Sequence, residues 1–179
     1  MPVIMFSRQF PAYHPRAGEP TYFVEKLLQS FVSLNLPGYY TDHIKRLRDL
    51  KYLDISKMVL DPMDKFHTVR AGHRFNPGDK FSPRVWMGKP YRSEQLILGP
   101  DVEVKKTWNF EVDQCGVCSL SNQYVYDYGI DGIGVLDTVA ANDGLSTHDF
   151  EGWIVQPAYR QAKAFDGQVI CWNDKIEYP

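Results

Sequence analysis

The part of the chain that follows residue 66 is a series of short extended segments separated by turn-forming pairs, and this pattern restricts the fold more than any other feature. Pairs such as Gly78-Asp79 and Gly99-Pro100 are typical of tight turns, and each lies between two apolar or β-branched segments. The expected strands cover residues 67–70, 80–86, 94–98, 102–112, 116–120, 123–126 and 168–172. So many short strands predict a small, partly open β-barrel.

Helical periodicity precedes this strand-rich part. After a short strand over residues 3–6 and a proline-rich loop, a helix is expected to begin near Pro20. Its apolar face consists of Phe23, Val24, Leu27, Leu28, Phe31 and Leu34. A second helix is expected from Thr41 or Asp42, with a solvated basic face, and a third over residues 56–60.

Two further helices are expected near the C-terminus. One covers residues 135–141, and the other begins at Ser146, where Ser146 and Asp149 resemble a capping box. Pro157 is expected to stop or kink that helix. Strands between flanking helices predict an α+β fold. We expect one domain over residues 1–179, with a helical N-terminal elaboration over residues 1–61 and a barrel core over residues 62–175.

Composition and charge exclude several classes of protein. The net charge of -2 argues against binding of polyanions through bulk electrostatics, so that a local patch would have to do this. An odd count of 3 cysteines favours a reducing compartment. The N-terminus does not resemble a signal peptide, and no apolar run approaches the roughly 20 residues that a membrane span needs. We expect a cytoplasmic protein without a membrane segment.

Basic and aromatic residues alternate in the segment from residue 65 to residue 92. Basic side chains suit phosphate groups and aromatic rings suit nucleobases, so this segment is a candidate nucleic-acid site. The alternative is that these cations lie at strand edges and keep the protein soluble. The candidate ligand-binding residues are Arg70, His73, Arg74, Lys80, Arg84, Trp86, Lys89, Tyr91 and Arg92.

The hexad Lys65-x-x-Thr68-x-Arg70 carries the strongest candidate chemistry. Alternation along a strand places Thr68 and Arg70 on one face and His67 and Val69 on the other. A lysine becomes a base only when burial or a nearby cation lowers its pKa, and an arginine can hold an anion. The spacing alone favours the plainer interpretation, in which Lys65 is a surface lysine and Arg70 a structural ion-pair partner.

Two further constellations have plain alternatives. Asp143 precedes a helix N-terminus and is suited to orient an ammonium group or to act as an acid or base, but Asp-Gly is also a common turn pair. Cys115 and Cys118 form a single Cys-x-x-Cys, which lacks the second pair that a structural zinc site needs. Two half-buried thiols in a strand are favoured there over a metal or redox site. We expect no metal and no cofactor.

The hexad, the basic loop after it and the turn Pro77-Gly78-Asp79-Lys80 resemble the ASCH domain, a branch of the PUA-like superfamily whose characterised bacterial members are 4-acetylcytidine amidohydrolases. The resemblance implies a PUA-like barrel over about residues 62–175. It also implies Lys65 as base, Thr68 as nucleophile or positioning hydroxyl, and Arg70 as anion holder. Asp143 stands where that family has a glutamate, and its side chain is one methylene shorter.

These observations together predict a protein that binds RNA or a modified nucleoside in a basic cleft. Hydrolysis of an acyl-amide on a cytidine is its most concrete activity, with Lys65, Thr68 and Asp143 as the catalytic set. One alternative is a non-catalytic RNA-binding module, and another is a structural or partner-binding protein. The sequence identifies no protein partner.

Overall fold

The computed structural model describes residues 1–36, 42–54, 64–127 and 134–178, and the described strands form two sheets. The five-stranded sheet has the order β2 (His67–Ala71), β9 (Phe165–Cys171), β6 (Lys106–Val112), β7 (Val117–Leu120) and β8 (Gln123–Asp127). In the four-stranded sheet, β3 (Lys80–Trp86) pairs with β1 (Val3–Met5), β4 (Gln95–Ile97) and β5 (Val102–Glu103). The α+β class is therefore confirmed, although the described strands do not close into a barrel.

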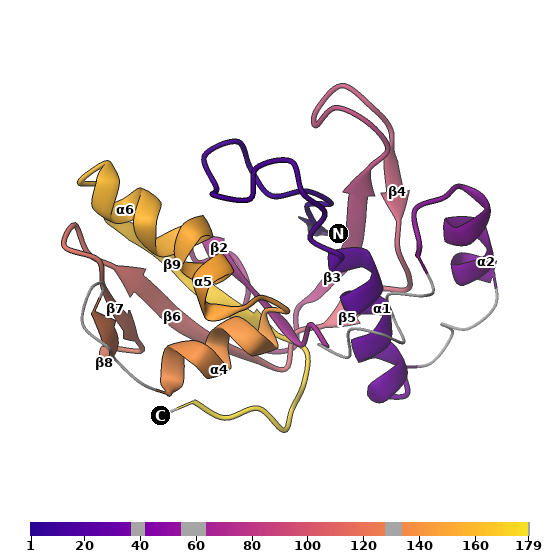
Figure 1. Ribbon diagram of the computed structural model, residues 1–179. Helices are drawn as coiled ribbons and strands as arrows, with labels where there is room; N and C mark the ends of the chain where they lie inside the picture. Colours follow the sequence, from indigo (N-terminus) through magenta and orange to yellow (C-terminus); the bar gives the residue numbers. More distant parts are fainter. Residues whose placement is uncertain (37–41, 55–63, 128–133, 179) are drawn as a thin grey trace.

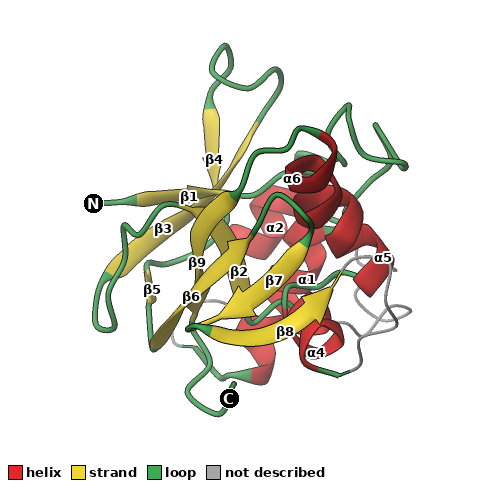
Figure 2. Ribbon diagram, turned by 90° about the vertical axis from the view of Figure 1, so that its left-hand side faces the viewer, coloured by secondary structure: helices red, strands yellow, loops and turns green. Residues whose placement is uncertain are grey.

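The helices lie against both sheets. In Figure 1, α1 (Phe23–Ser33) and α2 (Asp42–Asp49) lie on the side of the four-stranded sheet. The other side carries α4 (Val135–Asn142), α5 (Thr147–Phe150) and α6 (Gln156–Arg160), which follow one another along the five-stranded sheet. Seen from the side in Figure 2, strands occupy one part of the molecule and the helices gather behind them.

The expected apolar face of the first helix is confirmed by burial. Phe23, Val24, Leu27, Leu28 and Phe31 are buried in α1, and the helix begins at Phe23 rather than near Pro20. In the second helix Leu47 is buried, while Lys45, Arg46 and Arg48 are exposed as expected. The third expected helix, over residues 56–60, lies outside the described residues.

One expected strand is divided between the two sheets. The segment 102–112 forms β5 and β6, because the chain changes its hydrogen-bonding partner between Val104 and Lys105. The Val104 amide donates to the carbonyl of Asp79 beside β3, whereas the Lys105 amide donates to the carbonyl of Cys171 at the end of β9. This change links the two sheets through a continuous segment.

The helix that begins after Ser146 runs past Pro157 instead of stopping there. Ser146 caps it as expected, since its hydroxyl accepts from the Asp149 amide at 3.1 Å. A π-helical turn, η1 (Glu151–Val155), separates α5 from α6, and Pro157 lies in the first turn of α6. Proline is tolerated in a first turn because its missing N–H is not needed there.

A single hydrophobic core joins the two sheets and the helices. Trp172, directly after β9, lies at its centre. Its ring meets the edges or faces of Phe6, Phe31 and Phe81, which come from the segment after β1, from α1 and from β3. The indole N–H donates to the Ser30 hydroxyl at 3.3 Å, so that this buried polar group is satisfied.

Candidate functional site

Lys65 lies directly before β2 and has no exposed surface, which is rare for a lysine. Its Nζ donates to the backbone carbonyl of Asp143 at 2.6 Å and to the carboxylate Oδ1 of the same residue at 2.8 Å. The ammonium also lies 4.0 Å from the centre of the Phe23 ring. A second ammonium, that of Lys26 on α1, donates to the Gly144 carbonyl at 2.7 Å. Both lysines therefore neutralise the C-terminal end of α4, where the partial negative charge of a helix collects.

The charges of Lys65 and Asp143 are set by burial and by each other. Burial raises the pKa of the Asp143 carboxyl, the Lys65 ammonium and the His67 ring lower it, and the net shift is downward. Burial lowers the pKa of Lys65 to about 8, although the attraction of Asp143 opposes this shift. At neutral pH the two groups form an ionised pair in a region closed to solvent.

His67 extends this buried network to the C-terminal segment. Its Nε2 lies 2.8 Å from the hydroxyl oxygen of Tyr178, which also accepts from Nδ2 of Asn142 at 2.9 Å. Its Nδ1 lies 3.6 Å from Oδ1 of Asp143. Burial lowers the pKa of His67, so the ring is neutral at pH 7. Sequence reasoning missed Tyr178 and Asn142, because both lie far from His67 in the sequence.

Thr68 is buried in β2 opposite Ile170 of β9. Strand alternation directs its side chain away from the face that carries Lys65 and His67. Both side-chain hydrogen bonds of Lys65 that the structure describes go to Asp143, and neither goes to Thr68. The structure therefore brings together two members of the expected catalytic set, Lys65 and Asp143, and leaves the hydroxyl outside their hydrogen-bonding network.

Arg70 is half-buried on β2, an edge strand of the five-stranded sheet. One terminal nitrogen donates to the Met5 carbonyl of β1 at 2.7 Å, and the guanidinium lies 5.6 Å from the centre of the Phe6 ring. Burial lowers the pKa of Arg70 from its usual range. Within the part of the chain that the structure describes, its buried Nε has no partner, and no carboxylate lies within 4.0 Å of the guanidinium.

Two cavities meet at Arg70 and Ala71. One, of about 350 Å³, is walled mainly by apolar and aromatic side chains, among them Tyr13, Trp153 and Phe165, and also contains Lys163. The other, of about 240 Å³, lies between β1, β2 and β9 and also contains Arg74 and Gln168. The only cation shared by the two sets of described lining residues is Arg70.

The remaining residues of the basic segment do not form one continuous surface. His73 pairs with the Asp166 carboxylate at 2.7 Å, and Arg84 donates to the Gln95 side chain at 3.0 Å. Lys80 is exposed at the start of β3, where it faces Glu103 on β5 and lowers the pKa of that carboxyl together with Lys105. Among the other candidate ligand-binding residues, Arg74 lines one of the two cavities that meet at Arg70, whereas His73, Lys80 and Arg84 line neither.

The last four residues of the segment lie at the β3–β4 connection. Trp86 and Lys89 line a different hollow, and the Trp86 ring lies 5.4 Å from that of Tyr91. The Tyr91 side chain is 90% exposed, and Arg92 is exposed beside it. Sequence reasoning therefore joined residues that the fold divides between two sites.

The cysteines lack the arrangement that a metal site requires. Cys115 is exposed in the β6–β7 turn, while Cys118 and Cys171 are buried in separate strands. In the described ranges no group of three histidine, cysteine or carboxylate side chains is arranged to hold a metal ion. The Asp113 carboxylate instead accepts from the amides of Cys115 and Val117, which closes the turn.

Comparison with protein-family models, with curated proteins and with solved structures finds no match to this chain. Among the described helices none has the length and apolar character needed to cross a membrane. The geometry of the site therefore supplies the arguments about function.

Proposed function

We propose that the protein is a PUA-like, ASCH-type nucleotide-binding protein that holds the anionic group of its ligand at Arg70. The ligand is a nucleotide, either free or as a residue of RNA. The ASCH-type assignment is supported by the direct contact between Lys65 and Asp143, because the resemblance places these two residues in one site.

One observation carries the binding proposal: the guanidinium of Arg70 lies between two cavities with part of its hydrogen-bonding capacity unused. One terminal nitrogen donates to the Met5 carbonyl, and the buried Nε has no partner among the described residues. A buried donor without an acceptor costs about 1–3 kcal/mol. A phosphate or carboxylate that enters either cavity would complement the charge of this half-buried guanidinium.

The larger Arg70 cavity suits the remainder of a nucleotide. Its walls contain the rings of Tyr13, Trp153 and Phe165, and a second cation, Lys163, lies at its border. The Tyr13 hydroxyl donates to the Trp153 carbonyl at 3.3 Å, which holds the proline-rich loop beside η1. Stacking of a base on an aromatic ring contributes about 1–3 kcal/mol. The combination of rings and cations favours a nucleotide over a purely apolar ligand.

Binding without hydrolysis is the function that the geometry supports best. An amidohydrolase mechanism requires the acyl group of the substrate to reach Lys65. The ammonium of Lys65 has no exposed surface, and Asp143 occupies it with two hydrogen bonds while Phe23 covers it. Asp143 therefore holds the buried lysine, whose ammonium caps the C-terminal end of α4.

Calorimetric titration with cytidine 5′-monophosphate and with cytidine tests the binding proposal. We expect the monophosphate to bind at least about tenfold more tightly, since a charge-assisted hydrogen bond contributes about 1.5–3 kcal/mol and 1.4 kcal/mol is tenfold. In Arg70→Gln this preference should disappear. Arg160→Gln, on the exposed end of α6, removes the same charge outside both cavities and should retain it.

Equal affinity of wild type for the two compounds, or the absence of binding to both, would contradict the proposal. A parallel incubation with 4-acetylcytidine measures released cytidine by chromatography. We expect no release above that of Lys65→Met. Release by the wild type that is lost in Lys65→Met, with circular dichroism showing the variant to be folded, would establish catalysis and refute binding without hydrolysis.

A further inference from the structure

A second and larger groove is lined in part by the segment that follows β1. It consists of two hollows of about 520 Å³ and about 490 Å³, which share Arg8 and Pro20 as lining residues. We call it the Arg8 groove. No described residue lines both this groove and the Arg70 cavities, so the two sites are separate. Volumes between about 300 and 1,000 Å³ are typical of ligand sites.

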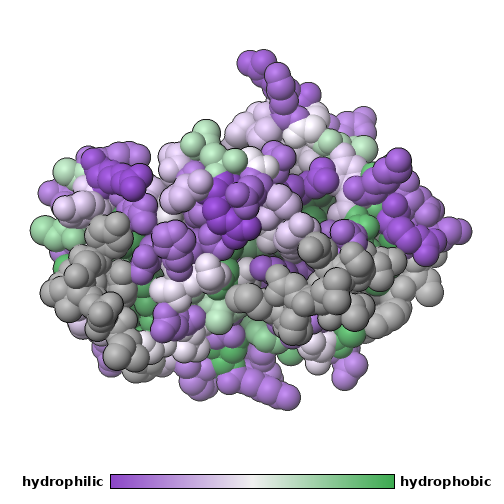
Figure 3. All heavy atoms as spheres, viewed as in Figure 1, coloured by the Kyte–Doolittle hydropathy of each residue, from purple (hydrophilic) through white to green (hydrophobic). Residues whose placement is uncertain are grey.

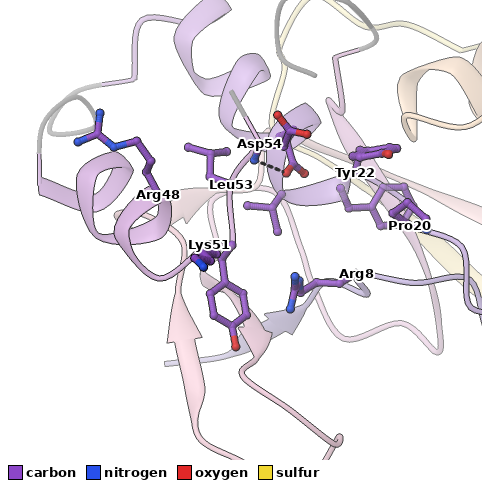
Figure 4. Close-up of a pocket in the computed structure, with 11 residues that line it drawn as sticks. Arg8, Pro20, Tyr22, Arg48, Lys51, Leu53 and Asp54 are labelled. Atoms are coloured by element: carbon purple, nitrogen blue, oxygen red, sulfur yellow. Dashed lines mark hydrogen bonds between the residues drawn. The ribbon is translucent and has the colours of Figure 1, made fainter. Parts of the chain in front are cut away.

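Four cations from three distant parts of the sequence border the Arg8 groove. Arg8 follows β1, Arg48 and Lys51 belong to the end of α2 and the turn after it, and Lys89 belongs to the β3–β4 connection. Figure 4 shows the Arg8 side chain extending toward the side of the first hollow that carries Lys51. All four side chains are exposed. Cations spaced along a groove can bind successive phosphates of a single nucleic-acid strand.

Aromatic side chains accompany these cations along the whole groove. Half-buried Tyr22 and Tyr52 line the first hollow and half-buried Trp86 lines the second, whereas Phe23 and Phe6, which also border these hollows, are buried in the core. The Arg8 guanidinium lies 4.3 Å from the centre of the Tyr52 ring, which leaves one side of a flat cation facing outward. Rings and guanidinium planes offer stacking surfaces to bases of any sequence.

Two carboxylates at one end of the groove make it more selective than a simple basic surface. Glu25 and Asp54 line the first hollow together with the cations. The Glu25 carboxylate accepts from the Asp54 amide at 2.9 Å, which fixes its position at the start of α1 (dashed line in Figure 4). Carboxylates repel a uniform polyanion, but they accept hydrogen bonds from the amino groups of cytosine, as they do in base recognition.

The rim of the groove is polar. Figure 3 shows hydrophilic side chains over the β3–β4 connection and over α2, the two elements that flank the Arg8 groove. Tyr52 connects these elements, since its hydroxyl donates to the Met87 carbonyl at 2.5 Å. The groove thus has a fixed aromatic floor between two charged walls, which differs from an apolar docking face for a protein.

We infer that the Arg8 groove binds a single strand of RNA, with phosphates on Arg8, Lys51 and Lys89 and with bases stacked on the aromatic floor. A duplex is a poor ligand, because its base faces are hidden inside the stack. This inference does not depend on the proposal for Arg70. The two sites differ in their residues and in the ligand that tests them.

Fluorescence anisotropy with a labelled cytidine-rich RNA 12-mer, measured over a range of salt concentrations, tests the inference on the full chain. Arg8→Glu should weaken binding at least tenfold at low salt. It should also reduce the slope of log K against log salt by about 0.7 for each phosphate that the protein no longer neutralises. Lys175→Glu makes a matching charge change at an exposed position outside the groove and should bind nearly as wild type.

A second variant separates stacking from charge. Trp86→Leu should weaken binding about five- to tenfold while leaving the salt slope unchanged, since every cation that meets a phosphate is still present. Circular dichroism confirms that each variant is folded. Equal affinities of Arg8→Glu and Lys175→Glu would refute the inference, as would binding of a blunt RNA duplex as tight as that of the single strand. Arg70→Gln should bind the RNA strand as tightly as wild type, because Arg70 lies outside the Arg8 groove. This result would support the groove even if the calorimetric titration showed no nucleotide binding at Arg70.

Discussion

At the scale of single residues, the most unusual feature is a lysine without any exposed surface. Lys65 and Lys26 hold the carbonyls of Asp143 and Gly144, and Lys65 also pairs with the Asp143 carboxylate. A buried pair of this kind contributes little net stability, but removal of one partner leaves an uncompensated charge. The main role that the contacts assign to Lys65 is therefore to fix the end of α4 against β2.

Replacement of Lys65 should be costly, and the cost should depend on pH. We expect Lys65→Met to lower the free energy of unfolding by about 3–5 kcal/mol at neutral pH, because Asp143 stays buried without its partner. The pKa of Lys65 is lowered from 10.5 to about 8 in the folded protein. Between these values the unfolded chain binds more protons, so a rise in pH favours the folded wild type.

If titration of Lys65 causes the rise in stability with pH, this rise should be absent from Lys65→Met. Urea unfolding at about pH 8 and about pH 10 should show the wild type gaining up to about 1.4 kcal/mol per pH unit relative to Lys65→Met. A difference between the two proteins that is the same at both pH values would contradict a lysine with a lowered pKa. Lys105→Met, which removes an exposed lysine, serves as the control.

At the scale of elements, the pairing of β2 with β9 determines where Arg70 stands. Gly167 of β9 lies opposite Ala71 of β2, and a Cβ atom there would come within 2.2 Å of the Arg70 carbonyl oxygen. The same glycine pairs with Phe110 of β6, so β9 cannot move away from one neighbour without disturbing the other. Only a glycine allows both strand pairs at this register.

Gly167→Ala is therefore expected to lower the free energy of unfolding by about 1–3 kcal/mol or more, and to weaken nucleotide binding through displacement of Arg70. Guanidinium unfolding and the calorimetric titration measure the two effects. Gly88→Ala is the matched control, because its Cβ would meet only the Ser93 side chain, at 3.4 Å. It should change the free energy of unfolding by no more than about 0.5 kcal/mol. Equal effects of both replacements would be incompatible with the described register.

Local sequence patterns predicted the helices and strands better than they predicted which residues meet in the candidate sites. Helical spacing predicted the buried face of α1, and the apolar segment 168–172 predicted an interior strand, which β9 is. The division of segment 102–112 between two sheets was not predictable, because it depends on which distant strand accepts each amide. Local spacing also cannot reveal that His67 bonds to Tyr178, 111 residues away, or that Arg8 and Tyr52 border one groove.

At the scale of the whole molecule, the two sheets share one core instead of forming two independent units. Buried residues from both sheets and from α1 belong to the same hydrophobic cluster. Trp172 contacts Phe6 and Phe81 on the side of the four-stranded sheet, although it follows directly on β9 of the other sheet. The segment after β1 contributes residues to both charged sites, since Tyr13 lines an Arg70 cavity and Arg8 lines the Arg8 groove.

A shared core predicts that the described sheets unfold together. Guanidinium unfolding followed by tryptophan fluorescence and by far-ultraviolet circular dichroism should give coincident transitions, as expected for a two-state domain. Trp172→Phe should move both midpoints to lower denaturant by the same amount, because the weaker packing and the missing bond to Ser30 affect both sheets. Trp108 in β6 and Trp86 in β3 remain as reporters in each sheet. Separate midpoints, or a shift in only one probe, would show that each sheet is stable by itself.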